Sequence, residues 1–124
     1  MPSDLDDDTV ADVATNMWRM MRRFADASNG AENGDLPRAQ RMTVRNLRSM
    51  SDRLAEAGVS VQDHDGITFD TGLMLKVLAY EPRPGIDREI VVETVRPSVY
   101  RAGRCIQMGE VIVGFPEKGQ HNGT

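Results

Sequence analysis

The chain has 124 residues and a formal net charge of −4, with 40% hydrophobic and 27% charged residues. This composition is typical of a globular protein rather than a disordered or membrane-embedded one. The acidic balance weighs against nucleic acid as the main partner, because phosphate contacts need clustered positive charge. The single cysteine, Cys105, precludes an internal disulfide, and the N-terminal residues lack the pattern of a signal peptide. A cytoplasmic protein is therefore expected.

The first half of the chain is predicted to form two amphipathic helices. From Val10 onward, apolar residues recur at spacings of three and four, and Asp8 or Thr9 is expected to cap this first helix. A loop with two Asn-Gly pairs follows over residues 28–35.

The second helix is bounded by residues with known positional preferences. Asp35 is expected near its N-cap and Pro37 near its first turn, and Gly58 is expected to end it. An acidic lead and these two helices make up a predicted helical dimerisation region over residues 1–58.

The second half is predicted to be rich in strands. The expected segments are an extended stretch with a turn over 59–70, a strand or mixed turn over 71–80, a loop over 81–87, and strands over about 89–95 and 104–115. The predicted fold class is therefore α+β, with a helix pair followed by a small all-β head over residues 59–115. The tail, 116–124, is predicted to be disordered.

The apolar faces of the two helices are broader than one antiparallel pair can bury, which predicts association of two copies. A monomer rarely exposes an apolar patch of more than a few hundred Å², and two helix pairs can form a four-helix bundle. Packing of the helices on their own strands is the alternative. The residues expected at the dimer interface are Val13, Met17, Met20, Phe24, Leu47, Met50 and Leu54.

Motifs for catalysis, metal binding and phosphate binding are not found in the sequence. There is no G-x-S-x-G elbow, no P-loop and no G-x-G-x-x-G. His64 lies between Asp63 and Asp65, but a turn explains this cluster better than a metal site. A Cys105–His64 dyad is disfavoured, because Cys105 lies inside a predicted strand. We therefore expect neither an enzyme nor a bound metal or cofactor.

Arginines at spacings of three and four form a stripe on the second predicted helix. They are Arg38, Arg41, Arg45 and Arg48. The stripe is either a solvated outer face or a docking surface for an acidic partner or nucleic acid. Met74 and Met108, outside the helices, are candidates for surface contacts.

Two segments of the chain resemble the GrpE-type nucleotide exchange factors of DnaK-type chaperones. The first is LAEAGVSVQDHDGITFDTGL, residues 54–73, and the second is EIVVETVRPSVYRAGRCIQMGEVIVGF, residues 89–115. The positions that match the family patterns are Gly58, Val59, Gly66, Phe69, Asp70, Leu73, Arg104, Ile106, Val111 and Val113. With the two helices, the resemblance covers about residues 8–115.

The resemblance implies a homodimer with a four-helix bundle and a small β-head. In this family the head binds the nucleotide-binding domain of the chaperone, opens its cleft and releases ADP. Arg104 holds the position of the family's head arginine and is expected to pair with an acidic group of the chaperone. The residues expected at this interface are Arg104, Ile106, Gln107, Met108, Val111 and Val113. For the two valines the alternative is a place in the head core, and for Arg104 it is a solvated strand end.

The departures from the family pattern support a second hypothesis. Gln107, Met108 and Gly109 replace an arginine and two small residues of the family signature, and the long stalk helix has no room before residue 8. A dimeric adaptor that keeps the fold without exchange activity is therefore the first alternative. A dimer that binds nucleic acid through the arginine stripe is the second.

Overall fold

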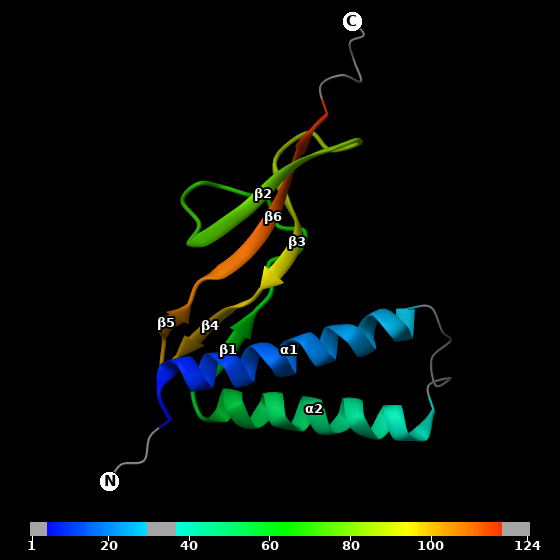
Figure 1. The fold of residues 1–124 in the computed structure, drawn as a ribbon, viewed down its shortest axis with the longest axis vertical. Helices are drawn as coiled ribbons and strands as arrows, with labels where there is room; N and C mark the ends of the chain where they lie inside the picture. Colours follow the sequence, from blue (N-terminus) through cyan, green and yellow to red (C-terminus); the bar gives the residue numbers. More distant parts are fainter. Residues whose placement is uncertain (1–4, 30–36, 118–124) are drawn as a thin grey trace, which may run out of the picture. The chain divides into compact units, whose positions relative to one another are not determined.

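The structure, a computed structural model, describes residues 5–29 and 37–117. Within these residues the chain forms two helices followed by six strands (Figure 1). They are α1 (Asp7–Asn29), α2 (Arg38–Glu56), β1 (Val59–Gln62), β2 (Leu75–Arg83), β3 (Ile90–Arg96), β4 (Ser98–Arg101), β5 (Arg104–Gln107) and β6 (Gly109–Pro116). The strands make two three-stranded sheets, in the orders β1-β4-β5 and β2-β6-β3. The fold class is α+β, as predicted.

The chain divides into two compact units that do not follow chain order. The first unit is the chain up to Val61 together with Val99–Ile106, and it holds both helices and most of β1, β4 and β5. The second unit is Gln62–Ser98 together with the chain from Gln107 onward, and it holds β2, β3 and β6. This grouping differs from the predicted boundary at residue 58, because β1, β4 and β5 belong with the helices.

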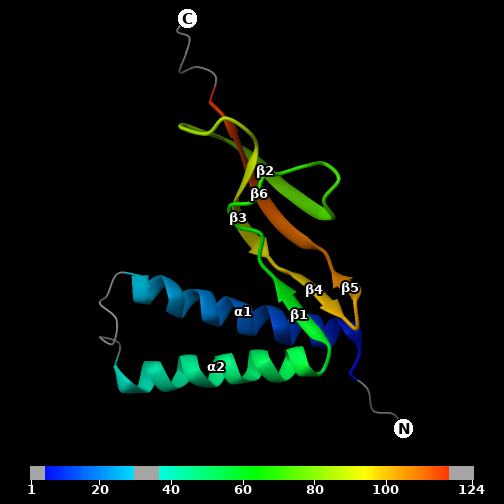
Figure 2. The same cartoon turned by 180° about the vertical axis from the view of Figure 1, so that it is seen from behind.

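In the first unit, α1 and α2 lie side by side and antiparallel (Figures 1 and 2). Leu47 of α2 is buried. A cluster of buried apolar residues joins α1 to the β1-β4-β5 sheet, and its members are Val10, Ala14, Val59 and Val99. Leu54, Val61 and Ile106 pack against this cluster. The helices therefore bury part of their apolar surface on their own strands.

The helix ends differ in part from the sequence prediction. The N-cap of α1 is Asp6 rather than Asp8 or Thr9, because the Asp6 carboxylate accepts a hydrogen bond of 2.7 Å from the Thr9 backbone N–H. Pro37 occupies the N-cap position of α2. Gly58 ends α2 as predicted, with a φ of 88° that few other residues adopt.

The predicted strand over 104–115 is in fact two strands, β5 and β6, and β4 was not predicted. β4 and β5 form a hairpin around Ala102 and Gly103, whose φ angles of 52° and 79° suit a two-residue turn. Met108 separates β5 from β6.

In the second unit, β6 is the central strand, parallel to β2 and antiparallel to β3. The core of the second unit contains Val91, Val111 and Val113, which are fully buried. The predicted loop over 81–87 is shorter than expected, because β2 continues to Arg83, which pairs with Pro116. Pro82 is tolerated there because β2 is an edge strand.

Several predicted features lie outside the described residues. They are most of the 28–35 loop, the N-cap at Asp35, and residues 118–124 of the predicted tail.

Neither α1 nor α2 is long and apolar enough to cross a membrane.

Candidate functional site

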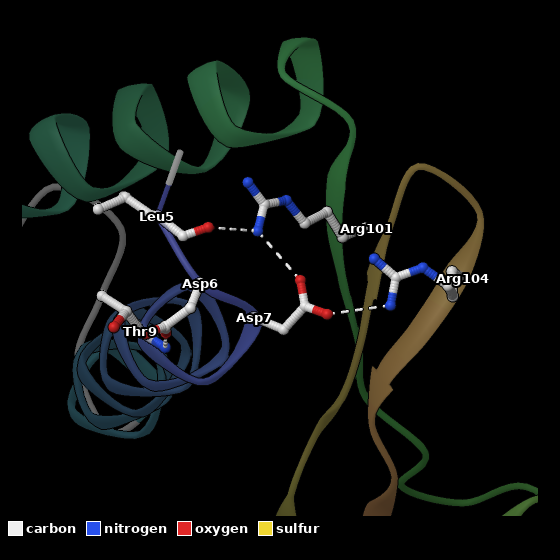
Figure 3. Close-up of polar contacts among 6 residues, drawn as sticks. All are labelled: Leu5, Asp6, Asp7, Thr9, Arg101 and Arg104. Carbon is white, nitrogen blue, oxygen red and sulfur yellow. Dashed lines mark hydrogen bonds and ion pairs between the residues drawn. The ribbon is translucent and has the colours of Figure 1, made fainter. Parts of the chain in front are cut away.

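A charged cluster in the first unit connects the start of α1 to the β4–β5 hairpin (Figure 3). Asp7 Oδ2 accepts a hydrogen bond of 2.9 Å from Arg104 Nη1, and Asp7 Oδ1 accepts one of 3.0 Å from Arg101 Nη1. Arg101 Nη1 also donates to the Leu5 carbonyl oxygen, at 2.8 Å. One carboxylate therefore bridges two guanidinium groups on either side of the hairpin turn.

The two arginines of this cluster differ in exposure. The Arg104 side chain is 65% exposed, whereas that of Arg101 is 27% exposed. The hydrogen bond from Arg104, and then that from Arg101, hold the pKa of the Asp7 carboxyl below its usual value, so Asp7 is ionised at neutral pH. Arg101 acts mainly as a structural tie, while Arg104 remains accessible to a partner.

The other residues expected at the chaperone interface have different surroundings. Val111 and Val113 are fully buried in the core of the second unit, so the core alternative holds for both. Ile106 packs against the core of the first unit. Gln107 is buried, and its side-chain amide donates a hydrogen bond of 2.9 Å to the Pro97 carbonyl oxygen. In contrast, Met108 is 45% exposed.

The second unit also exposes several apolar side chains, and Met108 is one of them. Met74, 61% exposed, directly precedes Leu75, which pairs with Gly109 just after Met108. Leu78 and Tyr80 are also exposed, and they lie on β2, the edge strand that Leu75 begins. Exposed methionines and an aromatic residue on a small sheet are typical of a contact surface for another protein.

Five of the seven residues predicted at the dimer interface line an open groove between α1 and α2. Met17 and Leu47 lie at its base and are buried, whereas Val13, Met20 and Met50 are 49%, 42% and 49% exposed. A second hollow on the same face adds Leu54, and Phe24 is half-buried. The groove thus leaves part of the apolar face of the helix pair uncovered.

His64 belongs to a buried hydrogen-bond network in the second unit. Its Nε2 lies 2.8 Å from the Ser98 hydroxyl oxygen, which also accepts a hydrogen bond of 3.0 Å from the Gly109 N–H. The His64 backbone N–H donates to the Thr94 hydroxyl, and the Thr94 N–H donates to the Asp65 carboxylate. Burial lowers the pKa of His64, although Asp63 and Asp65 act in the opposite direction.

This network explains the acidic residues beside His64 without a metal ion. The carboxylate of Asp63 accepts a hydrogen bond from the Asp65 backbone N–H, as in an Asx turn. In the part of the chain that the structure describes, no three side chains of metal-binding type come together.

Asp7, Arg101, Thr94 and Ser98 belong to these sites although the sequence analysis did not single them out. Asp7 is one of several adjacent acidic residues, and only its pairing with a hairpin 94–97 residues away distinguishes it. Ser98 lies in a strand that was not predicted. The sequence shows a glycine after Met108 but not why it is there. A Cβ atom at Gly109 would lie 2.7 Å from Ser98 Oγ.

The chain matches no protein-family model, and it is not significantly similar to any curated protein.

Proposed function

We propose that this chain is a GrpE-like co-chaperone of the cytoplasm that binds the nucleotide-binding domain of a DnaK-type chaperone and promotes ADP release. The main support is the order of its elements, an antiparallel helix pair followed by two small sheets. The resemblance in residues 54–73 and 89–115 implies a helix pair followed by a small β-head, and this order of elements supports the proposal. The protein needs no catalytic side chain or cofactor for this activity, because it acts by binding.

A second copy of the chain is the proposed occupant of the helix groove. The groove is lined by Val13, Met20 and Met50, which are apolar yet at least 42% exposed. Two such faces, packed against each other, would form a four-helix bundle and remove these side chains from water. At about 25 cal/mol per Å² of buried apolar area, burial of these faces favours the dimer.

Arg104 and Met108 are the proposed chaperone contacts among the residues expected at this interface. Arg104 presents an exposed guanidinium group on the first unit, and Met108 presents an exposed thioether side chain on the second unit. An acidic group of the chaperone would compete with Asp7 for Arg104. Truncation of one partner of a desolvated charge pair typically costs about 2–5 kcal/mol of binding energy.

The proposed mechanism is selection of an open nucleotide cleft. A protein that binds the open chaperone better than the closed one shifts the equilibrium toward the open state. To move this equilibrium from 1:99 to 99:1 requires about 5.5 kcal/mol of differential affinity. Several contacts of the size expected for Arg104 would supply this difference, and ADP would then leave the open cleft.

A dimeric adaptor without exchange activity is the second candidate, and the surroundings of Gln107 favour it. In the family signature this position is an arginine, whereas here Gln107 is buried and bonded to Pro97. The chain therefore presents no charge to a partner at this position. An adaptor of this kind would bind the chaperone without a change in ADP release.

The release rate of a fluorescent ADP from a DnaK-type chaperone of the same organism, with and without this protein, tests both candidates. An exchange factor accelerates release in proportion to its concentration until the chaperone is saturated. Binding of the chaperone without acceleration would favour the adaptor. Absence of both binding and acceleration would contradict both candidates.

A further inference from the structure

The charge of the protein is strongly segregated along the chain. Residues 19–48 contain seven arginines and three acidic residues, a net charge of +4, whereas the whole chain has a net charge of −4. The remaining residues therefore carry −8. The overall acidic balance consequently says little about which partner this segment would attract.

The helix pair brings these arginines to one end of the first unit. The C-terminal half of α1 lies beside the N-terminal half of α2 (Figures 1 and 2). We call this the arginine-rich end, and its members are Arg19, Arg22, Arg23, Arg38, Arg41, Arg45 and Arg48. Arg22 is half-buried and stacks over the Trp18 ring at 4.7 Å, and the other six are exposed.

Three of the arginines of α2 have no evident role in the stability of the helix. Arg38, Arg45 and Arg48 make no hydrogen bond or ion pair with any other residue that the structure describes. The first turn of α2 contains no acidic residue, and Arg38 and Arg41 lie near its positive end, where cations are unfavourable. Removal of these charges would not weaken the helix, which points to a role in binding.

We propose that the arginine-rich end binds the phosphate backbone of nucleic acid, without recognition of bases. The arginine stripe of α2, from Arg38 to Arg48, extends over about 15 Å of helix and so can contact successive phosphates. The segment 19–48 contains arginine but no lysine. The guanidinium group is planar and donates in pairs, a geometry that suits phosphate oxygens.

An anionic membrane fits this end less well than nucleic acid does. A helix that binds a membrane surface inserts an apolar face between the headgroups. The apolar face of α2, with Leu47 and Met50, is directed to the groove with α1. At 3.6 residues per turn, the arginine stripe lies roughly on the opposite side of the helix. Within the described residues, the large apolar side chain that lies beside the stripe is Met42, which lines the same shallow hollow as Arg38, Arg41 and Arg45.

Titration of fluorescent single-stranded RNA and duplex DNA of mixed sequence with the full-length protein tests the proposal. Anisotropy is measured between 50 and 200 mM salt. The variant Arg38→Gln/Arg45→Gln removes two charges from the arginine-rich end. The matched control is Arg83→Gln/Arg88→Gln, which removes two exposed charges from the second unit. Circular dichroism checks that both variants remain folded.

We expect the wild type to bind at 50 mM salt, with affinity that falls steeply as salt increases. The first variant should bind at least about tenfold more weakly, with the slope of log K against log salt reduced by about two. The control should retain the wild-type affinity and slope. Absence of wild-type binding at 50 mM salt, or equal losses in both variants, would overturn the proposal.

Two further probes distinguish nucleic acid from other anionic partners. Polyglutamate and vesicles rich in phosphatidylserine are titrated under the same conditions. We expect both to bind more weakly than RNA. Polyglutamate that binds as tightly as RNA would instead indicate an acidic protein segment, and tighter vesicle binding would indicate a membrane surface. The result does not depend on chaperone binding, because Arg104 is not part of the arginine-rich end.

Discussion

Asp7 and Arg104 form an ion pair of 2.9 Å across 97 residues of sequence. The residue proposed to contact the chaperone is therefore already engaged by an acidic group of its own chain. Since Asp7 also holds Arg101, the first turn of α1 and the β4–β5 hairpin are joined through one carboxylate. Asp7 therefore competes with the proposed partner for the guanidinium group of Arg104.

The first prediction follows from this competition. Asp7→Asn should increase the affinity for a DnaK-type chaperone, because Arg104 no longer has to leave a charged partner. It should also lower the melting temperature at neutral pH. The pKa of Asp7 is lower in the folded protein than in the unfolded chain, so ionised Asp7 stabilises the fold above its usual pKa of about 4. As the pH falls below about 4 this stabilisation is lost, and the difference in stability between variant and wild type should decrease.

Isothermal titration calorimetry measures the affinity, and Asp87→Asn is the matched control. Asp87 pairs with Arg88 in an exposed contact of the second unit, so its loss should leave chaperone binding unchanged. Weaker binding by Asp7→Asn would mean that the Asp7–Arg104 pair holds the arginine in its binding position.

The second prediction concerns Arg104 itself. Arg104→Ala should weaken chaperone binding by a factor that corresponds to about 2–5 kcal/mol, and the oligomeric state should stay the same. Arg88→Ala is the control, because Arg88 is equally exposed, at 63%. Equal binding of the wild type and Arg104→Ala would show that the family role of this position is absent here.

The sequence predicted the helices well and the strands only in part, for physical reasons that differ. Helix periodicity and the positive φ of Gly58 are local properties, so α1 and α2 are within a few residues of their predicted ends. The alternation in residues 104–115 continues through Met108, so it predicted one strand. Next to the break, the Gly109 N–H donates to the Ser98 hydroxyl and the His64 ring lies close to the glycine, and alternation carries no information about such contacts.

The same distinction applies to the candidate sites. The apolar spacing identified the two helix faces that line the groove, because Val13 and Met20 share a face of α1 by periodicity, as Leu47 and Met50 do on α2. The exposed fraction of each side chain could not be predicted from the sequence. Leu47 and Met50 looked equivalent in sequence, yet Leu47 is 4% exposed and Met50 is 49% exposed. Leu47→Asp would therefore test the packing of one helix pair as well as the dimer.

The third prediction isolates the dimer. Met50→Asp should convert a dimer to a folded monomer, because the charge is tolerated on the exposed groove of one chain but not within a bundle. Met42→Asp is the control, since Met42 is 42% exposed on the same helix but outside the groove. Sedimentation equilibrium measures the oligomeric state. A monomeric wild type at micromolar concentration would contradict the bundle.

The fourth prediction tests the close approach at Gly109. A Cβ atom at this position would lie 2.7 Å from Ser98 Oγ and 3.1 Å from the His64 ring. Gly109→Ala should therefore destabilise the protein by about 1–3 kcal/mol in urea denaturation, as overpacking of a tight site does. Gly72→Ala is the control, because its Cβ would be 3.5 Å from Asp70, an ordinary contact. Equal stability of the two variants would contradict this steric account.

The fifth prediction concerns the pH dependence of stability that His64 causes. In the folded protein burial lowers the pKa of His64, so the folded state favours the neutral ring. Neutral His64 allows the Ser98 hydroxyl to donate to Nε2 while it accepts from the Gly109 N–H. In the unfolded chain the ring takes up a proton near its usual pKa of about 6.5. The contribution of His64 is thus complete above that pH and decreases as the pH falls toward the lower folded pKa.

Urea denaturation between pH 7.5 and 5 measures this contribution, with His64→Gln as the non-titrating comparison. The free energy of unfolding of the wild type should decline more steeply on acidification than that of the variant, by at most about 1.4 kcal/mol per pH unit. The carboxylates are common to both proteins and cancel in the difference. Parallel profiles would mean that His64 is protonated equally easily in the folded and unfolded chains, and that its bond to Ser98 does not depend on the neutral ring.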